Sequence, residues 1–164
     1  VTALRASHHL LVSHGMAVGA LRAPGASGTR VGITLNLAPV HPASPSEEDR
    51  AAALRMDGHL NRWFLDPVFR GRYPEDMVAL FERRYGPLDC GAPGDRALMS
   101  APIDFLGINY YMPKTARASF NNGPLGIEQV PATSPLTALG GEVEPDWLHS
   151  LRLPVRRDSA PVPI

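Results

Sequence analysis

The chain has 164 residues, enough for one domain with a sizeable core. Its sixteen basic and sixteen acidic residues cancel, so no net charge attracts nucleic acid or an anionic membrane, and a small neutral substrate suits this balance better. Cys90 is the single cysteine, which excludes a disulfide framework and favours the cytoplasm, and no apolar run approaches the roughly 20 residues needed to span a bilayer.

The chain begins with a segment that the spacing of its apolar residues predicts to be a helix, residues 2–22. The residues that set this spacing are Leu4, His8, Leu11, Val12, Met16 and Leu21. The pair Pro24-Gly25 ends it. Residues 31–35 follow as a short, β-branched apolar run that closes on Asn36 and predicts a buried strand.

A second helical segment is predicted from about Ser44 to Leu65. Ser44 can cap it, Pro45 suits the first helical position, and Glu47 can complete a capping box. Asp66-Pro67 should interrupt the helix, because the residue before a proline is disfavoured in helical conformation.

Three further elements complete this part of the chain. A helix is expected from about Pro74, with apolar residues on one side, until residues 86–87 end it. Its apolar positions are Met77, Leu80, Phe81 and Tyr85. A short helical turn at 95–100 then precedes a strand at 103–111.

Two apolar strands separated by helices indicate parallel pairing through a crossover, so the predicted class is α/β. Residues 112–141 lack periodicity and predict a loop of about 30 residues. A last helix is expected at 145–153, and Val162 looks like the beginning of a strand that the chain does not complete. We therefore expect residues 1–164 to be a fragment of a single domain.

The search for catalytic and cofactor motifs is mostly negative. Neither glycine-rich phosphate loop is present, and we expect no nucleotide or other cofactor. The spacing of His8, His9 and His14 is not that of a zinc motif, so we expect helix histidines and no metal. No serine lies in a nucleophile elbow. Asp104 lies at the beginning of its strand, the wrong end for a parallel-sheet site, and is expected to be structural.

Polar side chains gather at the carboxyl ends of the two predicted strands. Asn36 ends the first, and Asn109 and Tyr111 end the second. Ligands bind beyond this end of parallel strands, so the residues form either a substrate-facing rim or a simple strand cap. Tyr110 should point to the opposite face and pack.

The chain resembles the retaining β-glucosidases of glycoside hydrolase family one. The blocks that carry the resemblance are VGITLNLAPVHPAS, DGHLNRWFLDPVFRGRYPEDM and SAPIDFLGINYYMP. The opening SHHLLVSHGMAVGALR is similar to the helix after that family's acid/base motif, and the end of the chain resembles the approach to its nucleophile strand. The similarity covers nearly the whole chain, in order and at the right spacing.

The resemblance implies a (β/α)8 TIM barrel, of which the chain supplies a middle portion with about strands 5 and 6. It implies hydrolysis of terminal β-D-glucosides by double displacement between two glutamates. Neither glutamate is in the chain, since no Asn-Glu-Pro and no Glu-Asn-Gly occurs. By resemblance, Tyr111 supports the nucleophile, Asn109 lies beside the catalytic pair, and Asn36 faces the leaving-group subsite.

The sequence also departs from the family pattern. Gly141 replaces a large aromatic residue and Trp147 replaces a glycine, which puts local folding of 139–150 in doubt. Three interpretations stay open. The chain is a segment of an active β-glucosidase, inactive by itself; or it is a truncated or degenerate remnant, at most a weak sugar binder; or it is an unrelated α/β binding protein.

Overall fold

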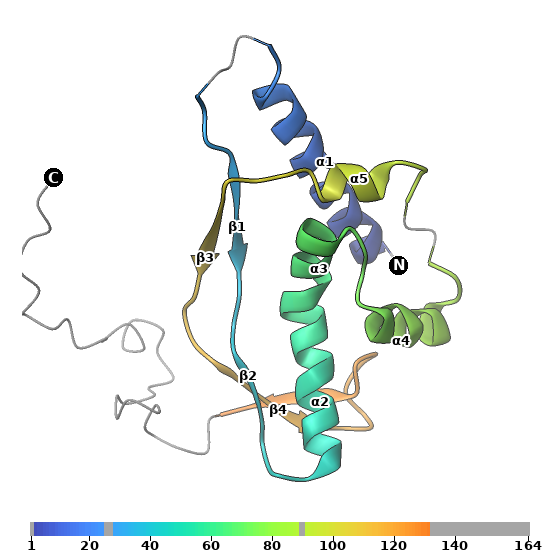
Figure 1. Cartoon of the computed structure of the whole chain (residues 1–164). Helices are drawn as coiled ribbons and strands as arrows, with labels where there is room; N and C mark the ends of the chain where they lie inside the picture. The colour runs from blue at the N-terminus through green and yellow to red at the C-terminus, as the bar shows by residue number, and fades with distance from the viewer. Residues whose placement is uncertain (1, 25–27, 89–90, 132–164) are drawn as a thin grey trace, which may run out of the picture.

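The computed structural model describes residues 2–24, 28–88 and 91–131 of the chain (Figure 1). Its elements, in chain order, are α1 (Thr2–Leu21), β1 (Gly32–Asn36), β2 (Val40–Pro42), α2 (Glu47–Asp57), the π-helical turn η1 (Gly58–Arg62), α3 (Trp63–Arg70), α4 (Glu75–Tyr85), α5 (Asp95–Met99), β3 (Phe105–Asn109), β4 (Lys114–Ala118) and β5 (Ile127–Val130).

Strands β1 and β3 pair in parallel, as the sequence predicts for an α/β protein. The register runs from Gly32 opposite Phe105 to Asn36 opposite Asn109. The connection between them contains the short strand β2 and then the helices α2 to α5, so the two strands form a crossover unit (Figure 1). At the amino ends, the Asp104 carboxylate accepts a hydrogen bond of 2.8 Å from the Val31 backbone N–H.

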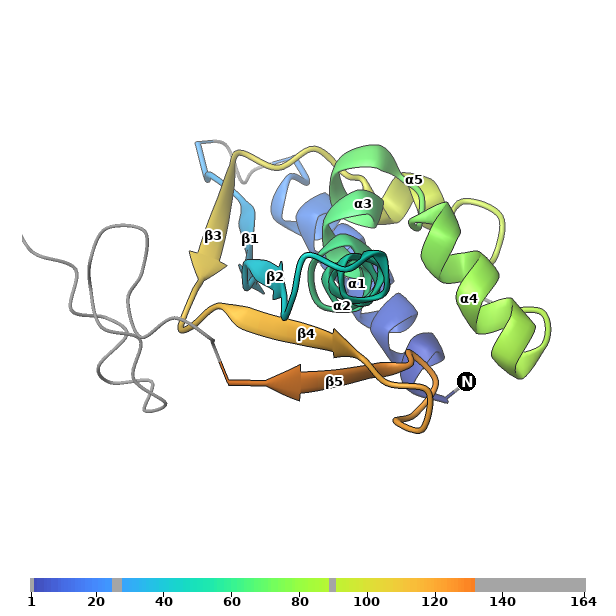
Figure 2. The same cartoon turned by 90° about the horizontal axis from the view of Figure 1, so that it is seen from below.

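The helices lie on one side of the β1–β3 pair (Figure 2). Ile33 of β1 packs against buried residues of three helices, Leu11, Val68 and Met99. A second cluster centres on Trp63, whose ring stacks on Tyr73 at 4.4 Å and meets Phe81 edge-on at 5.2 Å. The main core is therefore built between helices and the helix-facing side of β1.

A second sheet has three strands in the order β2-β4-β5 and packs against α2. Strands β2 and β4 are parallel, and β4 and β5 form an antiparallel hairpin. The prediction of a long loop over 112–141 is thus wrong for residues 114–118 and 127–130. Ala116 of β4 is fully buried against Ala52 and Met56 of α2, and this tertiary packing supplies what local periodicity lacks.

Two details of the predicted helix at 44–65 are wrong. The N-cap is Ser46, whose Oγ accepts from the Asp49 backbone N–H at 3.2 Å, while Ser44 donates to the Asp49 carboxylate at 2.6 Å. Asp66-Pro67 does not end the helix either, because Pro67 lies inside α3 and the helix continues to Arg70, with Gly71 as its C-cap. Burial of Trp63 and its neighbours offsets the ~3 kcal/mol that an interior proline costs.

The other helices predicted within the described residues are confirmed as α1, α4 and α5. The helix expected at 145–153, the strand expected at Val162, and Gly141 and Trp147 lie outside the described residues. None of the helices that the structure describes has the length and hydropathy to cross a membrane.

Candidate active site

The two asparagines predicted for the site lie next to each other at the carboxyl ends of the parallel pair. Asn36 and Asn109 are register partners, and both are exposed. The ladder continues past them, since the Leu37 backbone N–H donates to the Asn109 carbonyl at 3.0 Å. The fold therefore brings together two polar side chains that are far apart in sequence.

The strand face that carries these asparagines points away from the helices. Residues alternate along a strand, so Asn36 shares the face of Thr34 and not that of the buried Leu35. Gly107 packs on Thr34 across the pair, and a Cβ at position 107 would lie 2.5 Å from the Thr34 hydroxyl oxygen. Because position 107 is a glycine, the larger side chain of Thr34 can lie over it, as side chains do in the layered interior of a barrel.

Tyr110 and Tyr111 follow β3 directly. Their exposed fractions are similar, 45% and 48%. Continued alternation places Tyr111 on the side of Asn109 and Tyr110 on the side of Ile108. Tyr110 does not show the packing that the sequence predicts, because Ile108 and Tyr110 are both exposed among the described residues.

A pocket of about 610 Å³ borders the two asparagines. Its walls come from the beginning of α1, from β1 and β3, and from the turn between α2 and α3. Ser7 is one of these wall residues; its hydroxyl accepts from the Trp63 indole N–H at 2.9 Å and donates to the Leu4 carbonyl at 2.8 Å. The pocket therefore lies between the carboxyl ends of β1 and β3 and the adjoining helices.

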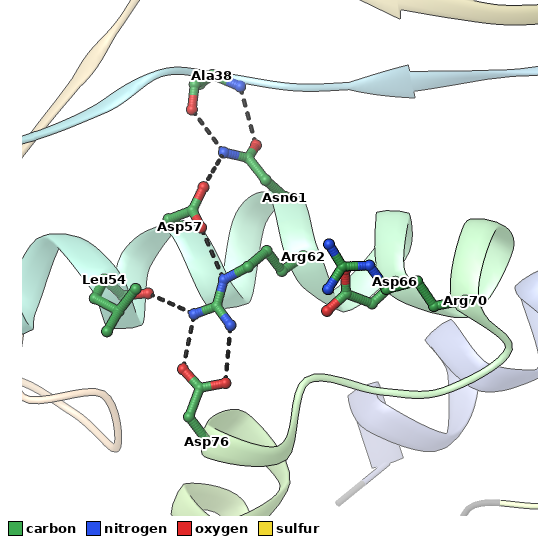
Figure 3. A network of polar contacts seen from close by, with 8 residues as sticks. All are labelled: Ala38, Leu54, Asp57, Asn61, Arg62, Asp66, Arg70 and Asp76. Atoms are coloured by element: carbon green, nitrogen blue, oxygen red, sulfur yellow. Dashed lines mark hydrogen bonds and ion pairs between the residues drawn. The ribbon is translucent and has the colours of Figure 1, made fainter.

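Sequence reasoning missed a polar network that reaches this end of β1 (Figure 3). The buried side chain of Asn61 contacts both backbone polar groups of Ala38, two residues after Asn36. Asp57 accepts from Asn61 at 2.7 Å and from Arg62 at 2.9 Å. The available signal was an acidic residue and an amide four positions apart on a helix, a pair that meets on one face.

The network ends in a bidentate ion pair between Arg62 and Asp76, with N–O distances of 2.8 and 2.7 Å. The hydrogen bonds from Arg62 lower the pKa of Asp76, and those to Asp76 and Asp57 raise the pKa of Arg62 above its ordinary value. Asp57 lies at the end of α2 and not at a helix start, so the macrodipole does not explain its presence.

Of the helix histidines, His8 behaves as a core residue, whereas His9 is exposed. His8 is buried, and its two ring nitrogens lie 3.0 Å from the Tyr73 hydroxyl and 3.0 Å from an Asp95 carboxylate oxygen. The contact with His8 lowers the pKa of Asp95. Within the described residues, no three His, Cys, Asp or Glu side chains converge as metal ligands would.

Comparison with known proteins identifies the fold. Residues 1–137 match the model of glycosyl hydrolase family 1. The chain is 39% identical to thermostable beta-glucosidase B of Thermobispora bispora, over 96% of this chain and 33% of that protein. It is 34% identical to a bifunctional beta-D-glucosidase/beta-D-fucosidase of Bifidobacterium breve, over 90% and 33%.

Solved structures agree with these relatives. A beta-glucosidase from Exiguobacterium marinum matches with a TM-score of 0.75 and 40% identity, covering 84% of this chain and 31% of that one. Virulence factor SghA of Agrobacterium tumefaciens, in complex with its substrate analog salicin, matches with a TM-score of 0.72 and 38% identity, covering 90% and 32%.

The chain spans about a third of the length of the curated relatives it matches. The neighbouring structures are (β/α)8 barrels, so the parallel pair and its helices are part of such a barrel, as the sequence predicts, without closing one. These 164 residues are a fragment of an enzyme of glycosyl hydrolase family 1.

Proposed function

We propose that the chain is a segment of a retaining β-glucosidase that hydrolyses terminal β-D-glucosides by double displacement. The observation that carries the proposal is the pair Asn36 and Asn109, exposed side by side at the carboxyl ends of two parallel strands. This is the end at which barrel enzymes bind their substrates. Membership of glycosyl hydrolase family 1 and the β-glucosidase relatives support the choice of substrate.

Each of the three site residues has a role in this proposal. Asn36 faces the leaving group, Asn109 is a polar contact that supports the nucleophile beside the catalytic pair, and the Tyr111 hydroxyl donates to the nucleophilic carboxylate. Such a hydrogen bond favours the ionised form that attacks the anomeric carbon. The acid/base and the nucleophile are glutamates outside these 164 residues, about 5 Å apart as retention requires.

The chain alone should therefore not hydrolyse an aryl β-glucoside, because it supplies neither glutamate. Activity should appear when the chain replaces the matching third of Thermobispora bispora beta-glucosidase B. Release of the aryl alcohol measures both cases. Turnover by the purified chain, or an inactive but folded chimera, would contradict the proposal.

Tyr111→Phe in the active chimera tests the tyrosine. Loss of a hydrogen bond to a charged group should lower kcat/KM about ten- to a hundredfold. The matched control is Tyr110→Phe, which removes the same atom from a neighbour of similar exposure and should leave kcat/KM nearly unchanged. Equal losses in the two variants would remove Tyr111 from the site.

We also propose that the enzyme is cytoplasmic. The chain has a single cysteine and so cannot form an internal disulfide, and proteins without disulfides are typical of the reducing cytoplasm.

A further inference from the structure

We propose that Asn61 is a positioning residue for the leaving-group side of this active site. Its amide holds the carboxyl end of β1 and so determines where Asn36 presents its side chain. The inference rests on the proposed function, because Asn36 matters only if a substrate lies there. It assigns a role to a residue that touches neither substrate nor catalytic carboxylate.

The contact between Asn61 and Ala38 has the pattern of a strand ladder. The Ala38 backbone N–H donates to Asn61 Oδ1 at 3.1 Å, and Asn61 Nδ2 donates to the Ala38 carbonyl at 2.8 Å. One side-chain amide thus satisfies both polar groups of one backbone residue, as a neighbouring strand would. Asn61 is only 8% exposed, so water competes little for these bonds.

The opposite edge of the same segment is fixed by backbone alone. Leu37 N–H donates to the Asn109 carbonyl at 3.0 Å, and the Pro39 carbonyl accepts from Lys114 N–H at 2.8 Å. Residues 37–39 therefore have β3 and β4 on one side and Asn61 on the other. Removing the amide would release one side of the segment that directly follows Asn36.

Asp57 determines which way the Asn61 amide faces. Its carboxylate accepts from Asn61 Nδ2 at 2.7 Å, so the nitrogen must point toward Asp57 and the Ala38 carbonyl. A reversed amide would place its oxygen against two acceptors and its nitrogen against the Ala38 N–H. The orientation that bonds Ala38 is therefore the only one that the surroundings accept.

The π-helical turn explains how one carboxylate contacts two consecutive residues. Asp57 bonds Asn61, four positions later, and Arg62, five positions later. A regular α-helix aligns positions three and four apart, whereas the wider turn η1 also brings the fifth into reach. The Arg62–Asp76 pair then fixes this turn to α4 (Figure 3).

Two substitutions of Asn61 distinguish the effect of its amide hydrogen bonds from the effect of its side-chain size. Asn61→Leu keeps the size and removes all three hydrogen bonds. Asn61→Asp keeps an acceptor for the Ala38 N–H, removes the donor to the Ala38 carbonyl and sets a second carboxylate beside Asp57. The control is Asn121→Leu, the same change at an exposed turn residue.

Amide hydrogen exchange of the 164-residue chain gives the first measurement. The Ala38 amide should be protected, and Asn61→Leu should lower its protection at least about tenfold while amides in α1 and α4 keep theirs. Asn121→Leu should change nothing at Ala38. If Ala38 stays protected without the Asn61 amide, the proposal fails. If Asn61→Leu does not fold, Asn61→Asp must show the loss instead.

Kinetics of the chimera give the second measurement. Asn61→Leu should raise KM about tenfold for a disaccharide, whose leaving sugar reaches Asn36, and much less for an aryl glucoside, with kcat little changed for either. Equal losses for both substrates indicate a merely structural role and overturn the proposal. An inactive parent chimera would overturn the proposed function, and exchange at Ala38 would still decide whether Asn61 holds the strand end.

Discussion

At the scale of single residues, the Nε2 atom of His14 is unusual. It is buried and has no hydrogen-bond partner among the residues that the structure describes. Burial disfavours the charged imidazolium and lowers the pKa of His14 below its ordinary value of 6.5. The folded state therefore binds a proton at this ring less readily than the unfolded state does.

This difference makes stability depend on pH. As the pH falls below about 6.5, His14 becomes protonated in the unfolded chain but stays largely neutral in the folded chain. The unfolded state is thereby stabilised relative to the folded state, so the free energy of unfolding falls as the pH decreases. The carboxylates with lowered pKa act in a lower window, below their ordinary values of 3.8. Urea unfolding measured between about pH 7.5 and 5 should show the loss of stability that His14 causes.

His14→Leu should reduce this loss and not abolish it, since burial also lowers the pKa of His59. The matched control is His9→Leu, at an exposed position of the same helix, which should keep the loss because His14 is still present. An unchanged pH dependence in His14→Leu would mean that other groups cause it.

At the scale of elements, α1 and α5 approach each other closely at Gly15. A Cβ at Gly15 would overlap the carbonyl oxygen of Leu98, so only glycine allows this approach. Gly19 lies one turn later on α1, and a Cβ there meets nothing within 4 Å. The two glycines therefore have opposite expected responses to the same substitution.

Gly15→Ala should lower the free energy of unfolding by about 1–3 kcal/mol, because α5 must move away. Gly19→Ala should raise it by about 0.5–1 kcal/mol through helix propensity. Denaturant unfolding measures both changes. If Gly15→Ala is as stabilising as Gly19→Ala, the close approach of the two helices is wrong.

The sequence predicts elements whose signal is local. Helical spacing predicts α1 and α4, and β-branched apolar runs predict β1 and β3 with their parallel pairing. It misses β4 and β5, because their packing partner is α2, far away in sequence. It also misplaces the cap at Ser44, since two nearby serines offer the same chemistry and only Ser46 has the geometry.

The candidate site divides in the same way. The positions of Asn36 and Asn109 follow from strand ends, which a sequence reveals. The role of Asn61 does not, because two of its three hydrogen bonds are to the backbone of Ala38 and depend on the π-helical turn. The functions of Asn36, Asn109 and Tyr111 stay predictions until the chimera is measured.

At the scale of the whole molecule, the part of the chain that the structure describes leaves β3 partly uncovered on the face that it shares with the buried Leu35 of β1. Ile108 of β3 is 59% exposed, and the outer edges of β1 and β3 pair with no strand among the described residues. Open edges and apolar strand residues promote association between chains.

The purified chain should therefore self-associate as its concentration rises, and Ile108→Lys should reduce this, because a charge on an edge strand opposes pairing. Leu54→Lys is the matched control, with a similarly exposed residue on a helix surface (56%), and should have little effect. Light scattering or size-exclusion chromatography measures the outcome. Equal effects of both lysines would indicate that added charge alone, and not the strand edge, controls association.

The parallel pairing of β1 and β3 also has a consequence for how the chain folds. Val31 and Asp104, which fix the beginning of the pair, are separated by 73 positions, and every helix from α2 to α5 lies between them. Closing so long a loop costs conformational entropy before any contact between the strands can offset that cost. The helices should therefore be largely formed in the transition state, and β1 and β3 should join late. A ribosome would then have to release all of β3 before the polar rim at Asn36 and Asn109 could exist at all.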